Sequence, residues 1–267
     1  MKVFFSDLDG TLLTSKKTIS PATKAAIDTF VNAGNIFVIS TGRALSSALA
    51  LRDHYGLNYP GSFLSAYNGS ILYDNSKETV IYKTGIPSEL VPDIIALADK
   101  YNLHIQSYRD RYIVTREFND HVDYYMNKTK MSVIISQDFF AEIDPVPPKL
   151  LAIDIHNPER LYPLRDEVRK KYGSQLNVIF SEPTFCEFIS SDAGKGKALL
   201  ALCNILGVSR ENTLAAGDEE NDIPMLEAAG TGIAMKNALD EVKASADIVT
   251  ENDNDHDGLV PLLLGNL

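Results

Sequence analysis

The strongest constraint on this chain is a short apolar strand that runs directly into two carboxylates. Val3–Phe5 predict a buried strand, and residues 7–11 then read Asp-Leu-Asp-Gly-Thr. Acids two positions apart in an extended chain point the same way. They repel each other unless a cation or a shared proton compensates. Because ligands of open α/β sheets bind beyond the carboxyl ends of the strands, the pattern predicts a chemical site there.

Two other interpretations fit parts of this pattern. Asp and Gly are common in turns, so residues 7–11 also suit an ordinary polar turn. A calcium loop of the EF-hand type fits poorly, because its sixth position requires glycine and Leu12 stands there. A second acidic stretch, 253–258, begins like such a loop but has Leu264 in place of the bidentate Glu. We expect a polar turn before a helix at that point.

The chain on both sides of residues 84–188 alternates between strand and helix patterns. Ser20 and Pro21 predict the start of a helix, and residues 35–40 predict the next buried strand. Strand, helix and strand in this order indicate a parallel pair with a right-handed crossover. We therefore predict an α/β fold, with a Rossmann-like, doubly wound parallel sheet formed by residues 1–83 and 189–267.

Residues 84–188 differ in pattern and predict an inserted α+β domain. Its predicted strands cover residues 103–107, 111–115, 149–155, 175–181 and 184–190. Its predicted helices cover residues 87–101, 118–128, 137–142 and 158–172.

Three further polar clusters follow predicted strands or precede predicted helices. Thr41 lies between a strand and a helix, where a hydroxyl usually caps the helix and can equally bind a phosphate oxygen. Lys195 and Lys197 precede a predicted helix, 198–206, where positive charge opposes the helix dipole. Asp218 directly follows a predicted strand of small residues, as Asp7 does. Two acids at the ends of neighbouring strands would converge on one point.

In this order the four clusters resemble the motifs of the haloacid dehalogenase (HAD) superfamily of phosphohydrolases. Residues 7–11 resemble motif I, Thr41 motif II, and the Gly-Asp-x-x-Asn-Asp run at 217–222 motif IV. Lys195 stands directly before a glycine, as the motif III lysine does, and Lys197 is the alternative. The insert resembles a type C2B cap, and the Cof-type phosphatases are the most similar subgroup. The Met-x-Asn-Ala run at 235–238 is also similar to that subgroup.

The resemblance implies a role for each candidate residue. Asp7 would be the nucleophile and Asp9 the general acid and base. Magnesium, the implied cofactor, would be held by the Asp7 carboxylate, the Asp9 backbone carbonyl and the Asp218 carboxylate. The residues implied to contact the phosphate are Gly10, Thr41, Gly42 and Lys195. The residues implied to orient ligands or to border the substrate are Asn68, Asn221 and Asp222.

Composition limits the partners of the chain. A net charge of −11 argues against nucleic acid and anionic membranes as partners. Cys186 and Cys203 are the only cysteines and do not form a disulfide framework. No apolar run approaches the roughly 20 residues of a membrane span, and the first residues do not resemble a signal peptide. We expect a cytoplasmic protein that is a monomer or a weak homodimer.

The function implied is a Mg²⁺-dependent phosphoric monoester hydrolase that acts on small phosphorylated metabolites, with sugar phosphates expected as substrates. A phosphomutase that resembles phosphomannomutases is the alternative, followed by a non-catalytic phosphometabolite sensor. The candidates for substrate specificity in the insert are Arg109, Arg111, Glu182, Glu187 and the loop 182–185.

Overall fold

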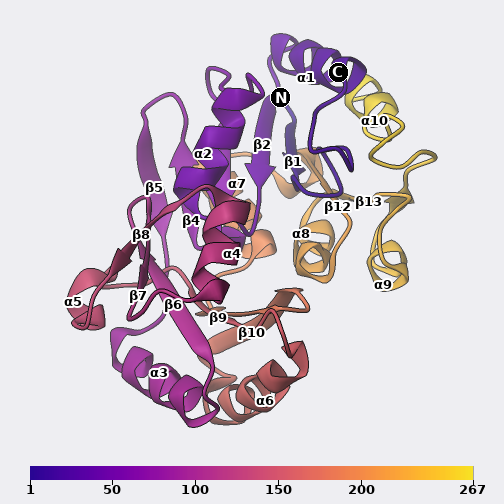
Figure 1. Cartoon of the computed structure of the whole chain (residues 1–267). Coiled ribbons are helices and arrows are strands. Elements are labelled where there is room, and N and C mark those ends of the chain that lie inside the picture. Colours follow the sequence, from indigo (N-terminus) through magenta and orange to yellow (C-terminus); the bar gives the residue numbers. More distant parts are fainter. Residues whose placement is uncertain (267) are drawn as a thin grey trace. The chain divides into compact units, whose positions relative to one another are not determined.

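A computed structural model of the protein describes residues 1–266 (Figure 1). Within this part of the chain the contacts define two compact units. The core unit contains residues 1–43 and 48–82 and continues from residue 194 onward. The inserted unit contains residues 44–47 and 83–193. The inserted unit overlaps most of the predicted insert, 84–188, and the folding of that insert as a domain of its own stays a prediction.

The core unit is built on a sheet whose described residues form eight strands in the order β14-β13-β12-β1-β2-β3-β4-β5. All pairs from β14 to β3 are parallel, and β4 runs antiparallel to β3. This topology confirms the predicted α/β class. The strands are β1 (Val3–Ser6), β2 (Ile36–Ser40), β3 (Phe63–Ala66), β4 (Ile71–Asp74), β5 (Thr79–Lys83), β12 (Thr213–Gly217), β13 (Thr231–Ala234) and β14 (Ile248–Val249).

Strand β1 lies inside the sheet, between β12 and β2. Its phenylalanines are fully buried, as expected for a parallel strand that is covered on both faces. Phe4, for example, packs with its ring centroid 6.0 Å from those of Phe30 and Phe37. Ser6 is level with Ala216 on β12 and with Ile39 on β2. The polar residues that follow these three strands therefore share one edge of the sheet.

The first core helix follows its sequence signals closely. Helix α1 (Pro21–Asn32) has Ser20 as its N-cap, with the hydroxyl accepting a hydrogen bond from the Thr23 N–H. Helix α7 (Lys195–Leu206) begins at Lys195, three residues before its predicted start. The predicted start was wrong because it followed the apolar run, which begins at Ala198, whereas the helix already includes both lysines. The other helices that follow core strands are α2 (Leu45–His54), α8 (Ile223–Ala228), α9 (Asp240–Ala244) and α10 (Val260–Leu264).

The inserted unit, all of whose residues are described, contains a six-stranded sheet in the order β10-β11-β9-β6-β7-β8. Its pairs are antiparallel except for the last, β7 with β8. Buried residues of α3 and α6 share an apolar cluster with sheet residues such as Phe188. The strands are β6 (His104–Arg109), β7 (Tyr112–Thr115), β8 (Ser132–Ile135), β9 (Leu150–Ile153), β10 (Leu176–Glu182) and β11 (Phe185–Ser190). The helices are α3 (Val91–Lys100), α4 (Asp120–Thr129), α5 (Phe139–Glu142) and α6 (Leu161–Tyr172).

Strand β8 was not predicted from the sequence. It is a short edge strand whose residues are exposed or half-buried, so it lacks the apolar pattern of a buried strand. It becomes a strand by pairing with β7 after a left-handed residue, Lys130, ends α4.

None of the helices in residues 1–266 combines the length and the apolar character needed to cross a bilayer.

His104 is a buried histidine at the start of β6. Its Nδ1 accepts a hydrogen bond from Asn119 Nδ2, and its Nε2 lies 3.2 Å from Gln106 Oε1. With His121 and Arg116, it lines a polar cavity of about 620 Å³ within the inserted unit. Burial lowers the pKa of His104 to about 4, from an ordinary value of 6.5. The neutral imidazole is therefore the form that the fold favours.

Replacing His104 by Gln should weaken the acid sensitivity of the inserted unit. The unfolded chain binds a proton at His104 below about pH 6.5, whereas the folded chain resists it down to about pH 4. Stability from this group is therefore complete above pH 6.5 and falls as the pH is lowered. The loss should reach about 2 kcal/mol between pH 6.5 and 5. Urea unfolding of wild type and variant over this range measures it.

A suitable control is His54→Gln, which removes a histidine from an exposed position on α2. The control should keep the wild-type slope of unfolding free energy against pH. Equal slopes for His104→Gln and wild type would contradict the assigned role of the buried imidazole.

Candidate active site

Lys195, the first residue of α7, lies between two carboxylates at the edge of the core sheet. Its Nζ donates to Asp7 Oδ1 and to Asp222 Oδ1, each at 2.6 Å. All three side chains are almost completely buried. Burial opposes the charged form of Lys195, but the two carboxylates outweigh it and raise the lysine pKa. Lys197, by contrast, is exposed, so the geometry favours Lys195 as the motif III lysine.

Asp218 enters the same cluster from the end of β12. Thr11 Oγ1 donates to Asp218 Oδ1 at 2.7 Å. The backbone N–H groups of Asp218 and Glu219 donate to Asp222 Oδ2 at 3.0 and 3.1 Å. Burial, together with the nearby Asp222 carboxylate, raises the pKa of Asp218 to about 7 despite the bond from Thr11. Burial also raises the pKa of Asp7 well above its usual range. This cluster therefore favours additional positive charge.

The residues of the cluster fit a divalent cation with hard-oxygen preference. Asp7, Asp218 and Asp222 each offer a carboxylate oxygen, and these oxygens lie within 4.8 Å of one another. Both oxygens of Asp222 already accept hydrogen bonds, from Lys195 and from the backbone. Asp7 and Asp218 are consequently the better direct ligands, and Asp222 is better suited to orienting Lys195. Carboxylate oxygens are the donors that Mg²⁺ prefers.

Gly10 allows the first turn of the site to approach Asp218. Its φ is +90°, a conformation that residues with a side chain rarely adopt. A Cβ at this position would lie 2.1 Å from Asp218 Oδ2. Any other residue would therefore push the Asp218 carboxylate out of the cluster.

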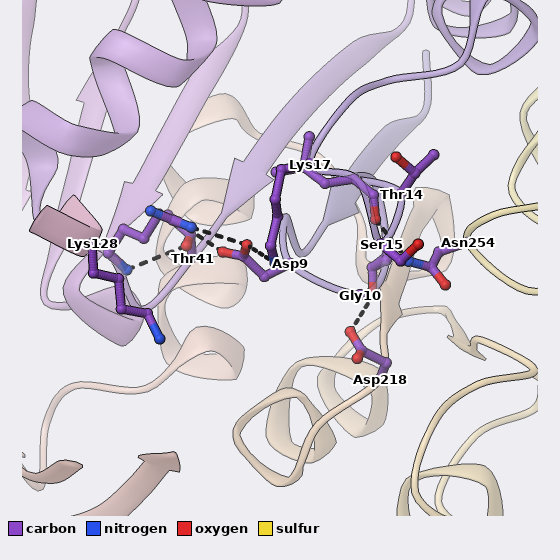
Figure 2. Close-up of polar contacts among 12 residues, drawn as sticks. Asp9, Gly10, Thr14, Ser15, Lys17, Thr41, Lys128, Asp218 and Asn254 are labelled. Atoms are coloured by element: carbon purple, nitrogen blue, oxygen red, sulfur yellow. Dashed lines mark hydrogen bonds and ion pairs between the residues drawn. The ribbon is translucent and has the colours of Figure 1, made fainter. Parts of the chain in front are cut away.

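Asp9 does not join the carboxylate cluster through its side chain. Arg43 Nε donates to its Oδ2 at 2.7 Å, and Arg43 Nη2 donates to its Oδ1 at 2.9 Å. Lys17 Nζ donates to Oδ1 at 2.8 Å. Figure 2 shows Lys17 and Asp9 side by side. Partial burial opposes ionisation of Asp9, but the hydrogen bonds from Arg43 and Lys17 outweigh it. They lower its pKa to about 2.

The two acids of the first motif therefore have opposite environments. Asp7 is buried beside two other carboxylates and one lysine, whereas Asp9 is half-buried beside two cations. The two environments push the pKa values of Asp7 and Asp9 apart, and Asp7 has the higher pKa. A nucleophilic Asp7 and an acidic Asp9 need the reverse order. A charged ligand that enters the site therefore has to reverse the order of the two pKa values.

The remaining predicted site residues form a second contact group beside β2. Thr41 Oγ1 accepts from the Arg43 N–H at 3.2 Å within the loop. Helix α2 begins only at Leu45, so Thr41 does not cap it as its place in the sequence suggested. The Asn68 N–H donates to the Thr41 carbonyl, and Asn68 Oδ1 accepts from Asn221 Nδ2 at 2.9 Å. A Cβ at Gly42 would lie 2.9 Å from Asn68 Oδ1. These residues come together at the same edge of the sheet.

The specificity candidates of the inserted unit all have contacts inside that unit. Arg109 pairs with Glu142 at 2.6 Å, and Glu182 pairs with Lys128. Arg111 Nη2 lies 3.4 Å from Tyr112 Oη. Glu187 is 3 % exposed, and it accepts from Lys149 Nζ at 2.9 Å and from Ser181 Oγ at 2.7 Å. Glu187 therefore belongs to a buried ion pair. A role of these residues in specificity stays a prediction.

Sequence reasoning assigned no role to several residues that shape the site. Arg43 lies two residues after Thr41, and that position at a strand-to-helix junction was a usable signal. Lys17 lies in a polar loop, and no spacing rule links it to Asp9. Thr11 was quoted in the first motif without a partner, and its partner Asp218 lies 207 residues away.

Comparison with known proteins gives the family. Residues 4–263 match the family described as haloacid dehalogenase-like hydrolase. A solved haloacid dehalogenase-like hydrolase from Bacteroides thetaiotaomicron is 30 % identical with a TM-score of 0.90. The alignment covers 100 % of this chain and 99 % of that one.

Two curated proteins of Bacillus subtilis are similar over almost their whole lengths. Phosphatase YwpJ is 29 % identical, with 96 % of each chain covered. The 5-amino-6-(5-phospho-D-ribitylamino)uracil phosphatase YwtE is 29 % identical, with 97 % of this chain and 96 % of the relative covered. With residues 4–263 matched, the chain belongs to the haloacid dehalogenase-like hydrolases and is an enzyme of the phosphatase type.

Proposed function

We propose that this enzyme is a Mg²⁺-dependent phosphatase of small phosphorylated metabolites, in particular sugar phosphates, which forms an aspartyl-phosphate on Asp7. The observation that carries the proposal is the buried cluster in which Lys195 bridges Asp7 and Asp222 beside Asp218. A structural ion pair needs one acid for one base. Three buried carboxylates with one lysine leave negative charge that a cation and a reaction can use.

Asp7 is the residue best suited to attack phosphorus. Lys195 holds its Oδ1, which fixes the orientation of the carboxylate and leaves Oδ2 for the reaction. Hydrolysis of phosphate monoesters is so slow without a catalyst that the enzyme has to lower the barrier by on the order of 20 kcal/mol or more. Transfer to Asp7 divides this barrier between two steps. Lys195 also offers its positive charge to the transferring phosphoryl group.

Asp9 donates a proton to the leaving group and later accepts one from water, once Arg43 and Lys17 contact the substrate phosphate. Arg43 and Lys17 hold Asp9 as a carboxylate in this structure. An anionic phosphate competes for the same cations, and this competition weakens their hold on Asp9 and raises its pKa. The protonated acid then gives its proton to the leaving oxygen, and the carboxylate later accepts one from the attacking water.

The Asp7 and Asp218 carboxylates and the Asp9 backbone carbonyl would hold the cation. When bound, Mg²⁺ supplies positive charge that offsets the repulsion between the carboxylates and the phosphate. That charge favours the ionised form of Asp7, the form in which it is a nucleophile. Gly10, Thr41 and Gly42 would contact the phosphate.

The substrate class follows from charge and from one relative. With a net charge of −11, the protein attracts an anionic substrate only through local cations such as Lys195 and Arg43. The phosphatase YwtE is named for a phosphate ester on a ribityl chain, a group derived from a sugar alcohol. This supports sugar and polyol phosphates as the first substrates to test.

Phosphate release should require both the metal and Asp7. The assay uses purified protein with sugar phosphates, polyol phosphates, nucleotides, pyridoxal phosphate and flavin mononucleotide. Wild-type protein with Mg²⁺ should release phosphate from one or more of them. EDTA should abolish release, and Asp7→Asn should lower kcat at least about 10³-fold because the nucleophile is lost.

The same assay separates the other functions. Phosphate release only after a bisphosphate activator is added would favour a phosphomutase. No release from any compound by folded, Mg²⁺-bound protein would contradict the phosphatase proposal and favour a sensor.

Substitution of the two lysines tests which one belongs to the site. Lys195→Met should lower kcat about 100-fold or more, because a preorganised charge is lost. It should also destabilise the protein by about 3 kcal/mol, since two carboxylates stay buried without their partner. Lys197→Met, at an exposed position two residues away, is the matched control and should retain activity within about twofold. Similar losses in both variants would refute the assignment.

A further inference from the structure

The loop between β13 and α9 contacts both acidic strand ends of the core unit. The Met235 N–H donates to the Gly217 carbonyl at 3.0 Å, and the Leu239 N–H donates to the Asp218 carbonyl at 3.1 Å. Between them, Asn237 Nδ2 donates to the Gly10 carbonyl at 2.7 Å. One short loop therefore joins the turn after Asp9 to the end of β12.

Asn237 is itself held by the segment near the C-terminus. Its Oδ1 accepts from the Asn254 N–H at 3.1 Å, and Asn254 Nδ2 donates to the Leu13 carbonyl at 2.8 Å. Asp255 Oδ1 accepts from the Ser15 N–H at 2.7 Å. In Figure 2, Asn254 lies beside the loop that carries Gly10 and Ser15.

The acidic stretch 253–258 has its carboxylates engaged within the protein. Asp253 Oδ1 accepts from the Asp255 N–H at 3.0 Å and lies 2.6 Å from His256 Nδ1. Asp257 Oδ1 accepts from the hydroxyls of Ser20 and Thr23 at the start of α1. The stretch is a series of turns before α10, as predicted. Its hydrogen bonds hold the loop and the helix start that lie within residues 10–23.

We propose that Asn237 is a positioning residue that sets the distance between the Gly10 turn and Asp218, and thereby the geometry of the Mg²⁺ site. The argument rests on the proposed function, because that function places Mg²⁺ between these segments. The hydrogen bond from Asn237 to the Gly10 carbonyl orients the peptide between Gly10 and Thr11. Thr11 Oγ1 in turn donates to Asp218 Oδ1 at 2.7 Å. Asn237 therefore acts on Asp218 through Gly10 and Thr11, while the loop that carries Asn237 also bonds the Asp218 backbone through the Leu239 N–H.

The Asn237 side chain is exposed, so water can replace its hydrogen bond to Gly10 when it is removed. The free energy of unfolding should then change little. Water does not impose the same orientation on the peptide, however, and groups that orient metal ligands contribute about 10- to 100-fold to affinity or activity. The expected signature is weaker Mg²⁺ binding in a folded protein.

The experiment compares Asn237→Ala with wild type by two measurements. The first is the Mg²⁺ concentration that gives half-maximal phosphate release, with kcat and KM determined at saturating Mg²⁺. The second is the rise in unfolding temperature with Mg²⁺ alone, which requires no substrate. Asn237→Ala should need about 10-fold more Mg²⁺ in both, with KM at saturating Mg²⁺ unchanged within about twofold.

Three further variants sharpen the result. Asn237→Gln keeps an amide that can reach the Gly10 carbonyl and should recover part of the lost Mg²⁺ affinity. Asn254→Ala, which removes the contact to Leu13 one step away, should shift the Mg²⁺ dependence less and in the same direction. Asn204→Ala, at an exposed position on α7, should leave it unchanged.

The outcomes separate this inference from the proposed function. No effect of Mg²⁺ on wild-type activity or unfolding temperature would overturn the proposed function. A normal response of wild type, matched by Asn237→Ala in both measurements, would overturn the positioning role alone. If Asn237→Ala proves unfolded, Asn237→Gln decides, because its longer side chain changes the contact to the Gly10 carbonyl: an unchanged Mg²⁺ dependence would also overturn the inference.

Discussion

The candidate active site of this phosphatase depends on one buried ammonium group between two carboxylates. Lys195 donates to Asp7 and Asp222 at 2.6 Å each, so three charged groups are removed from water together. Burying any one of these charges without its partners would cost free energy, so each charged group fixes the position of the others. The consequence reaches the backbone. Asp7 follows β1, Asp222 precedes α8, and Lys195 begins α7, so the charges fix three chain segments that are remote in sequence. Asp222 extends the constraint further, because its second oxygen accepts the N–H groups that follow β12.

Asp9, the second acid of the first motif, has surroundings very different from those of Asp7. The Asp9 side chain turns to Arg43 and Lys17, which keep it ionised. Asp7 lies in a dry cluster that disfavours its charge. The surroundings of the pair thus favour a state in which additional positive charge is present near Asp7. In the mechanism that we propose, substrate charge alone would regulate proton transfer, because phosphate and Asp9 compete for the same two cations.

The sequence was sufficient where the signal is local. The apolar residues of β1 followed by two acids, the Ser20-Pro21 helix start and the small residues of β12 each predict their own structure. The convergence of Asp7 and Asp218 also followed, because parallel strands share an edge. The predictions that failed concern features that depend on residues far away in the sequence. Lys195 is helical because distant carboxylates neutralise it, and β8 is a strand because β7 offers it a partner. The contacts of Lys17 with Asp9 and of Asn237 with Gly10 come from loops, whose paths no periodicity encodes.

The position of β1 inside the core sheet also has a consequence for biosynthesis. One of its two neighbours, β2, leaves the ribosome soon after it, but the other, β12, begins only at residue 213. Until then one edge of β1 has no partner, and Asp218 and Asn237 have yet to be made. A nascent chain therefore holds Asp7 and Asp9 long before it holds the acids that complete the carboxylate cluster. The unpaired apolar edge is a hazard for aggregation during that interval.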